Sequence, residues 1–153
     1  MGTDQMTPAE IVKKYKPDVE RLLPYVSYFE KMSGLSSSST FNEDGLSEHS
    51  LAFPVYDSTL LRFVKDAENS IFMDRNYRYV YTRNHIKTYQ DELAAIEKCT
   101  IQQLETIGGI LSNYVYGGRT KGVVWNQGVK NGVFLAAILK LQELIHFWES
   151  SKQ

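Results

Sequence analysis

The stretch that decides the fold runs from Thr100 to Trp148 and reads TIQQLETIGGILSNYVYGGRTKGVVWNQGVKNGVFLAAILKLQELIHFW. Thr100 and Gln103 have the spacing of a capping box, in which the hydroxyl accepts a free backbone N–H and the Gln side chain reaches back to the cap. Apolar side chains then recur at helical spacing, at Ile101, Leu104, Ile107, Leu111 and Val115. The pattern predicts a helix with one buried face, which Gly117 and Gly118 end.

Two further helices are expected in the rest of this stretch. Val123 to Asn131 is predicted as a short helix, and Gly132 as its exit in the left-handed conformation that glycine adopts cheaply. Apolar positions then repeat every three or four residues to the end of the stretch, at Val133, Phe134, Ala137, Ile138, Leu141, Leu144, Ile145 and Trp148. This last helix is expected to be the central strut of the domain.

Composition limits the class of protein. The chain has 153 residues, 42% of them hydrophobic, which suits a single domain with one core. The net charge of -1 gives no overall field for nucleic acid or an anionic membrane. Cys99 is the only cysteine, and the amino terminus lacks the apolar core of a signal peptide, so we expect a cytoplasmic protein. Apolar runs are amphipathic or interrupted, for example by Glu143, which argues against a membrane span.

The amino-terminal part carries two predicted helical segments. Residues 1–6 are expected to form a flexible terminus, and Thr7, Pro8 and Glu10 supply the cap, the first helical residue and the capping-box acid of the first helix. This helix is predicted to stop or bend near Pro17. A second helical stretch covers residues 19–32 and is predicted to kink at Pro24, because an interior proline removes one backbone hydrogen bond.

The middle of the chain mixes a loop with further helices. Residues 34–50 are rich in serine and lack apolar periodicity, so they are predicted as a loop. Residues 53–56 are predicted to be extended, and Asp57 or Ser58 is expected to cap a helix that continues through Asn69.

Residues 74–89 permit two interpretations. Tyrosines alternate with other residues as in a half-buried strand, at Tyr77, Tyr79 and Tyr81. The sequence offers no partner strand, and a lone strand would leave its backbone groups unpaired, so we predict a helix over residues 75–85. Another helix is predicted over residues 87–98, with Tyr89, Leu93 and Ile96 facing inward. Together these elements predict a compact all-α domain over residues 1–153, with about six or seven helices.

The carboxyl-terminal stretch also resembles a known family. Arg119, Trp125 and Gly132 stand in order between a tyrosine-rich helix end and a leucine-rich last helix that contains Leu135, Leu139 and Leu141. In this order the segment over residues 114–141, and more faintly residues 53–72, resembles an uncharacterised family of small, mostly helical bacterial proteins. The resemblance implies a helical fold and carries no activity, because a shared fold does not by itself imply a function.

The recurring catalytic and metal-binding patterns are absent from the sequence. His49, His85 and His146 are scattered, and there is no His-Glu-x-x-His, Cys-x-x-Cys or Gly-x-Ser-x-Gly motif. Cys99 reads as a small buried residue, since only Lys98 beside it would favour a thiolate. We therefore predict no catalytic residue, no metal site and no cofactor, although a site formed only in three dimensions is left open.

The turn around residues 116–122 is the preferred binding surface. Its glycines and the cations Arg119 and Lys121 resemble a phosphate loop but lack the order of a Walker motif, so an interhelix turn is favoured. Arg119 is the first choice for an anion partner, because a guanidinium can make two parallel hydrogen bonds. With Trp125 and Asn126 the turn is predicted to bind a protein partner or a second copy of the chain, making this a non-catalytic interaction or regulatory module.

Two alternatives use other residues. A basic and aromatic patch over residues 75–89 has a composition typical of nucleic-acid surfaces. Its candidate residues are Arg75, Tyr77, Arg78, Arg83 and His85. The second alternative is an enzyme or small-ligand binder, with a pocket that joins Arg119 to His85 or to the turn at Tyr56 and Asp57.

Overall fold

The computed structural model describes residues 7–32, 58–121 and 123–151. In chain order the elements are α1 (Pro8–Leu22), the 3-10 turn η2 (Leu23–Tyr25), α2 (Val26–Met32), α4 (Ser58–Glu68), α5 (Tyr77–Arg83), α6 (Tyr89–Lys98), the 3-10 turn η4 (Ile101–Gln103), α7 (Leu104–Thr120), α8 (Val123–Lys130) and α9 (Val133–Ser151). These residues contain no β-strand, so the predicted all-α fold is confirmed.

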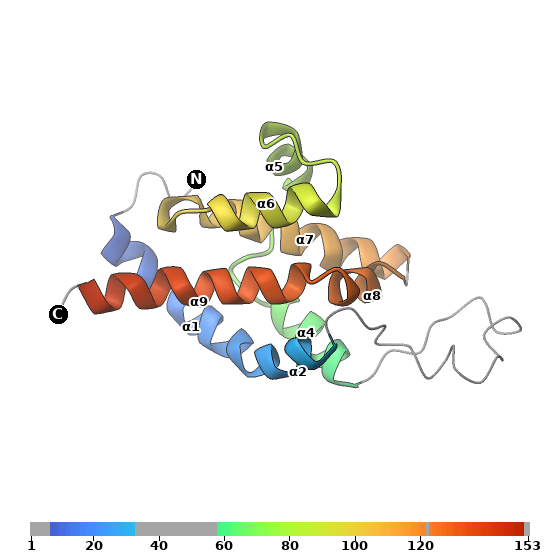
Figure 1. The fold of residues 1–153 in the computed structure, drawn as a ribbon, viewed down its shortest axis with the longest axis horizontal. Helices are drawn as coiled ribbons and strands as arrows, with labels where there is room; N and C mark the ends of the chain where they lie inside the picture. The colour runs from blue at the N-terminus through green and yellow to red at the C-terminus, as the bar shows by residue number, and fades with distance from the viewer. Residues whose placement is uncertain (1–6, 33–57, 122, 152–153) are drawn as a thin grey trace, which may run out of the picture.

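Helix α9 is the central element of the bundle. It runs along the length of the molecule, with α6 on one side and α1 and α2 on the other (Figure 1), and it packs against all three and against α8. Its buried positions follow the predicted stripe and include Phe134, Ile138 and Leu141, which are fully buried. The expectation of a central strut is confirmed.

An aromatic cluster ties the layers together. The ring centroids of Phe29 in α2 and Phe63 in α4 lie 4.8 Å apart, and Phe63 lies 5.0 Å from Phe134 in α9. Tyr114 in α7 adds an edge-on contact with Phe134 at 5.5 Å. Because all three phenylalanines are fully buried, one hydrophobic cluster joins segments that are far apart in the sequence.

Of the two prolines at which a break was predicted, Pro24 interrupts the amino-terminal helices and Pro17 does not. The capping box is present, with the Glu10 N–H 3.2 Å from Thr7 Oγ1. Helix α1 then continues through Pro17 to Leu22, so the predicted stop at Pro17 is wrong. The break lies at Pro24, where the 3-10 turn η2 separates α1 from α2. Proline suits the first turn of a helical segment, where its missing N–H has no partner to lose.

The ambiguous stretch forms a helix. Helix α5 is shorter than predicted, because His85 takes the left-handed conformation with φ 57° just after it. Helix α5 crosses α7 closely, since Gly109 leaves room for the Val80 side chain, which a Cβ at that glycine would meet at 2.8 Å. Tertiary packing thus overrides the strand preference of the tyrosines.

The helices α7 and α8 form the predicted hairpin with shifted boundaries, since Ile101–Gln103 form the separate turn η4 and α8 ends at Lys130 rather than at Asn131. The Thr100 N–H lies 3.2 Å from Gln103 Oε1, as in a capping box, and Gly132 has a φ of 81° between α8 and α9. Helix α7 does not end at its glycines but continues to Thr120. The reason is a contact across the hairpin, because the Trp125 indole occupies the space beside Gly118 where a side chain would stand.

Some expectations lie outside the described residues. These are the flexible terminus at 1–6, the loop over 34–50, the extended segment at 53–56, and His49. In the part of the chain that the structure does describe, no helix is both long enough and apolar enough to cross a membrane.

Candidate ligand-binding pocket

Arg119 stands on the outside of the molecule and is already paired. Its side chain is 53% exposed and forms an ion pair with Glu68 of α4. Its guanidinium also lies 5.8 Å from the centre of the Tyr116 ring. These contacts connect α7 to α4, so the guanidinium has partners within the chain.

Trp125 belongs to the packing between α7 and α8. Its Nε1–H donates to the Val115 carbonyl at 3.2 Å, and the ring is half-buried against Gly118. Asn126 beside it is also half-buried and has an interaction of its own. The indole is therefore neither fully exposed nor fully buried.

The basic and aromatic patch is divided between different faces. Tyr77 and Arg78 face a pocket towards α7 and α8, whereas Arg83 and His85 line a separate hollow beside Cys99. Arg75 is exposed just before α5. The candidates of this patch therefore do not form a single surface.

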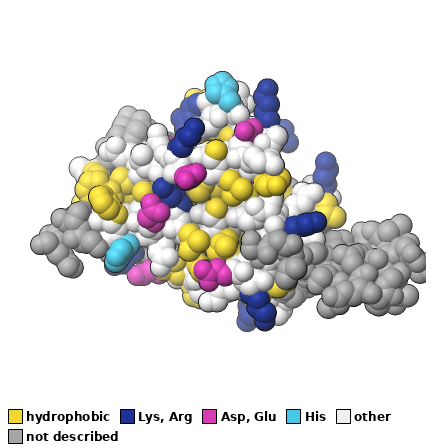
Figure 2. Space-filling view, viewed as in Figure 1, with side chains coloured by type: hydrophobic (Ala, Val, Ile, Leu, Met, Phe, Trp, Pro, Cys, Tyr) yellow, Lys and Arg dark blue, Asp and Glu magenta, His cyan; other side chains and the backbone are white. Residues whose placement is uncertain are grey.

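A pocket of about 990 Å³ lies between the start of α6, helix α5 and the hairpin of α7 and α8. It brings together Tyr77 and Arg78 from the patch and Lys121 from the glycine turn, which the sequence analysis placed in separate candidate sites. Its cations come from different segments and are Arg78, Lys87, Lys121 and Lys130. All four are exposed and form its rim. Figure 2 shows Lys and Arg side chains along the edge of the molecule over α5, α7 and α8.

The floor of this pocket is a buried carboxylate. Glu92 is only 5% exposed, and each of its oxygens accepts a tyrosine hydroxyl. Tyr81 donates to Oε2 at 2.6 Å and Tyr114 to Oε1 at 2.5 Å. Asn131 Nδ2 in turn donates to the Tyr114 hydroxyl oxygen at 3.2 Å. We call Glu92, Tyr81, Tyr114 and Asn131 the Glu92 network.

Burial governs the protonation of this network. Desolvation raises the pKa of Glu92 above its ordinary value, and the hydroxyls of Tyr114 and Tyr81 oppose that rise by stabilising the carboxylate. Burial and the hydrogen bond to Glu92 raise the pKa of both tyrosines, so their hydroxyls stay protonated donors. The hydroxyl protons therefore point at Glu92, whose oxygens are the acceptors in both hydrogen bonds.

The start of α6 holds one edge of the pocket rigidly. Thr88 Oγ1 accepts the Asp91 N–H at 3.2 Å, while Asp91 Oδ2 accepts the N–H groups of Lys87 and Thr88 at 2.9 and 3.1 Å. These backbone donors, that of Lys87 first, lower the pKa of Asp91. The capping box thus fixes the backbone that carries Lys87 and Tyr89 into the pocket rim.

The Glu92 network was not predicted, although Ile96 is buried and Leu93 packs against the core as expected, because Tyr89 and not Glu92 was placed on the inward face of this helix. Tyr89 is 45% exposed, so the prediction that it faces inward is wrong. The buried positions are Glu92, Ile96 and Cys99, which also have helical spacing. An acid in register with two apolar residues was the available signal.

Among the described residues, the one cysteine side chain is a buried thiol. Cys99 is buried, and its Sγ–H donates to the Gln103 carbonyl at 2.9 Å. Burial raises the pKa of Cys99 to about 12, so the group is a thiol rather than a thiolate. Within the described ranges, no group of three or more His, Cys, Asp or Glu side chains could hold a metal ion.

Comparison with known proteins adds no functional information. No family model, no curated protein and no solved structure matches the chain.

Proposed function

We propose that this chain binds a small anionic ligand in the pocket above the Glu92 network. The observation that carries the proposal is the charge of the lining, in which four cations surround one carboxylate although the whole chain has a net charge of -1. Such a concentration of one sign in a concave site raises the local concentration of an oppositely charged ligand. The small-ligand hypothesis placed the pocket around Arg119; in this proposal the cation from the same turn is Lys121, which lines the pocket.

The size and rigidity of the pocket favour a small molecule. Its volume of about 990 Å³ is at the upper end of the range typical of small-ligand sites. The capping box of α6 and the hydrogen bond from Asn131 to Tyr114 hold its walls from opposite sides. Because these contacts are made within the chain, little ordering of the pocket walls is needed on binding.

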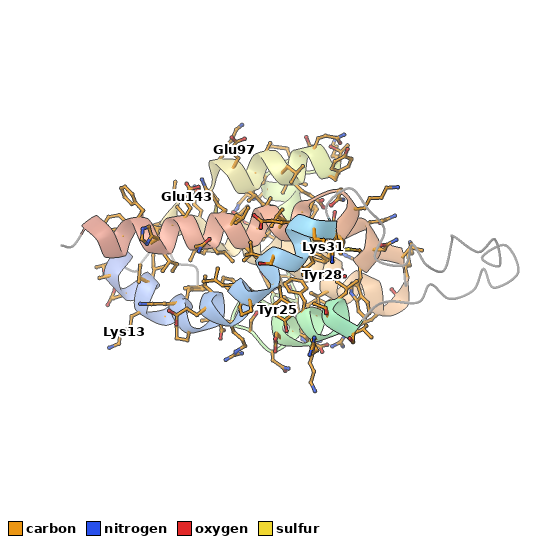
Figure 3. All side chains as sticks on the ribbon, turned by 60° about the horizontal axis from the view of Figure 1, so that its bottom comes forward. Lys13, Tyr25, Tyr28, Lys31, Glu97 and Glu143 are labelled. Carbon is orange, nitrogen blue, oxygen red and sulfur yellow. The ribbon has the colours of Figure 1, made fainter. Side chains whose placement is uncertain are left out.

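Calorimetric titration with pyrophosphate tests the proposal. The variant Lys121→Glu/Lys130→Glu reverses two rim charges, and we expect it to abolish measurable binding. Lys13→Glu is the matched control, because Lys13 projects from α1 on the side of α9 away from α6 (Figure 3). Added salt should weaken binding to the wild type, since exposed charges are screened. Equal affinity in the rim variant and the control would refute a role for the pocket cations.

The interaction-module and nucleic-acid hypotheses stay predictions. Trp125→Ala in a pull-down, together with a melting curve, tests the first. An oligonucleotide titration across a salt series tests the second, since phosphate contacts make affinity fall steeply with salt. Oligonucleotide binding that survives the rim variant would place the nucleic-acid surface outside the pocket.

A further inference from the structure

The pocket is layered by depth, and each layer has a different chemistry. Glu92 and Tyr114 are each 5% exposed and form the floor. Tyr77 and Tyr116 are half-buried and stand between floor and rim. The four cations are exposed at the mouth. A ligand that fills this space meets an acceptor at the bottom, aromatic rings at the side and positive charge at the top.

The floor selects a hydrogen-bond donor. An ionised carboxylate has about four acceptor sites, and the two tyrosine hydroxyls use one on each oxygen. The Asn131 amide is held in place at both atoms, because one N–H of Nδ2 donates to Tyr114 and Oδ1 accepts the Val133 N–H at 3.1 Å. An anion at this depth would face Glu92 directly and be repelled. The anionic part of a ligand therefore belongs at the rim, and its deep end must carry N–H or O–H groups.

The wall between these ends is aromatic. The rings of Tyr77 and Tyr116 lie 6.1 Å apart at an angle of 37°, and they come from α5 and α7. Arginine lies close to each ring, Arg78 at 6.0 Å from Tyr77 and Arg119 at 5.8 Å from Tyr116. Tyrosine and arginine surfaces of this kind favour contact with the planar ring of a nucleobase.

We propose that the ligand is a nucleotide with an amino-bearing base, its phosphates at the Lys and Arg rim and its amino group donating to the Glu92 floor. This inference rests on the proposed anion-binding function and deepens it. It assigns the phosphates to Arg78, Lys87, Lys121 and Lys130, the base to the Tyr77 and Tyr116 wall, and the choice of base to Glu92.

Titration calorimetry with matched nucleotides tests the assignment. ADP and CDP present an amino group where IDP and UDP present a carbonyl oxygen, and pyrophosphate presents the anion alone. In buffer containing EDTA, we expect ADP or CDP to bind about tenfold or more tightly than its carbonyl counterpart, because a hydrogen bond to a charged group is involved. We also expect the preferred nucleotide to bind more tightly than pyrophosphate.

Glu92→Gln provides the second arm, because a Gln amide can turn either its oxygen or its nitrogen to the base. The variant should lose the preference for the amino base. It should bind pyrophosphate at least as tightly as the wild type, because the carboxylate that repels an anion is gone, and this binding also shows that the variant is folded. Pyrophosphate binding with no gain from any nucleotide would overturn this inference and leave the anion site standing. No binding of pyrophosphate or of any nucleotide by the wild type would overturn both. An unchanged base preference in Glu92→Gln would also overturn the inference.

Discussion

At the scale of single residues, Glu92 makes the stability of the fold depend on pH. Because burial raises its pKa from the ordinary value of 4.5, the folded chain holds this proton to a higher pH than the unfolded chain does. The stabilisation is fully present below 4.5 and is lost as the pH rises through the raised pKa. The free energy of unfolding of the wild type should therefore fall over this window relative to Glu92→Gln, by at most about 1.4 kcal/mol per pH unit.

Urea unfolding at a series of pH values measures this difference. The substitution also changes hydrogen bonds to Tyr81 and Tyr114, but that effect is an offset common to every pH. Only the change of this difference with pH reports the ionisation of the Glu92 carboxylate. A difference between the two proteins that stays constant or grows with pH would contradict a raised pKa at Glu92.

Two neighbouring glycines give a second prediction at this scale. A Cβ at Gly118 would collide with the Trp125 indole, whereas at Gly117 the nearest atom is Val124 Cγ1 at 3.5 Å, an ordinary contact. We expect Gly118→Ala to lower the free energy of unfolding by about 1 to 3 kcal/mol through overpacking. Gly117→Ala should be neutral or stabilising by up to about 1 kcal/mol, because alanine is the better helix former. Thermal and urea unfolding measure both variants. Equal changes in the free energy of unfolding would contradict a specific contact between Gly118 and the Trp125 indole.

At the scale of elements, the capping box of α6 should contribute to stability and to the shape of the pocket. Thr88→Ala removes the acceptor of the Asp91 N–H and should cost about 1 kcal/mol. Thr82→Ala is the matched control, because that hydroxyl bonds only back to the Arg78 carbonyl within the helical turn. Urea unfolding should place the control within about 0.5 kcal/mol of the wild type. A control as damaging as Thr88→Ala would show that the cap has no special role.

The ends of helices were predictable from the sequence where they depend only on residues within one turn. The capping boxes at Thr7 and Thr100 and the left-handed Gly132 depend on neighbours within a turn, and all three are as predicted. The helix ends predicted at Pro17 and Gly118 were wrong, because whether a helix continues through these residues depends on their surroundings in the fold. A proline on the exposed side of α1 is tolerated, and a glycine under an indole is required.

At the scale of the whole molecule, the candidate site was beyond the reach of sequence patterns. Residues 77–78, 87–92 and 113–131 form one pocket only after α5 crosses α7 and α8 folds back. The sequence marked Tyr77 and Arg78 as part of the basic and aromatic patch and Lys121 as part of the glycine turn, without placing them together. Glu92 was missed because its helical register with Ile96 and Cys99 was the only sign of its burial, and the tyrosine hydroxyls that make the burial of a carboxylate possible come from α5 and α7.

The shared core leads to a prediction about cooperativity. Phe134 touches Phe29, Phe63 and Tyr114, so it links α9 to α2, α4 and α7. Phe134→Ala should lower the free energy of unfolding by about 3 to 5 kcal/mol, and the milder Phe134→Leu by less. Phe147→Ala is the control, because that ring is 60% exposed and its loss should cost within about 0.5 kcal/mol.

The two tryptophans report whether this destabilisation is global. Trp125 lies in α8 and Trp148 near the end of α9, so their fluorescence follows a different part of the chain from far-ultraviolet circular dichroism, which follows every helix. If the bundle unfolds as one unit, both signals should share one midpoint in the wild type and move together in Phe134→Leu. Fluorescence and dichroism transitions that separate in urea would mean that the bundle unfolds in more than one step. Because Trp148 in α9 also contributes to the fluorescence, repeating the experiment with Trp148→Phe would show whether the hairpin of α7 and α8 is the separate unit. The pocket would then join two units of different stability, and ligand binding would raise both midpoints towards a common value, because a ligand held by α6 and by the hairpin stabilises only the state in which both are folded.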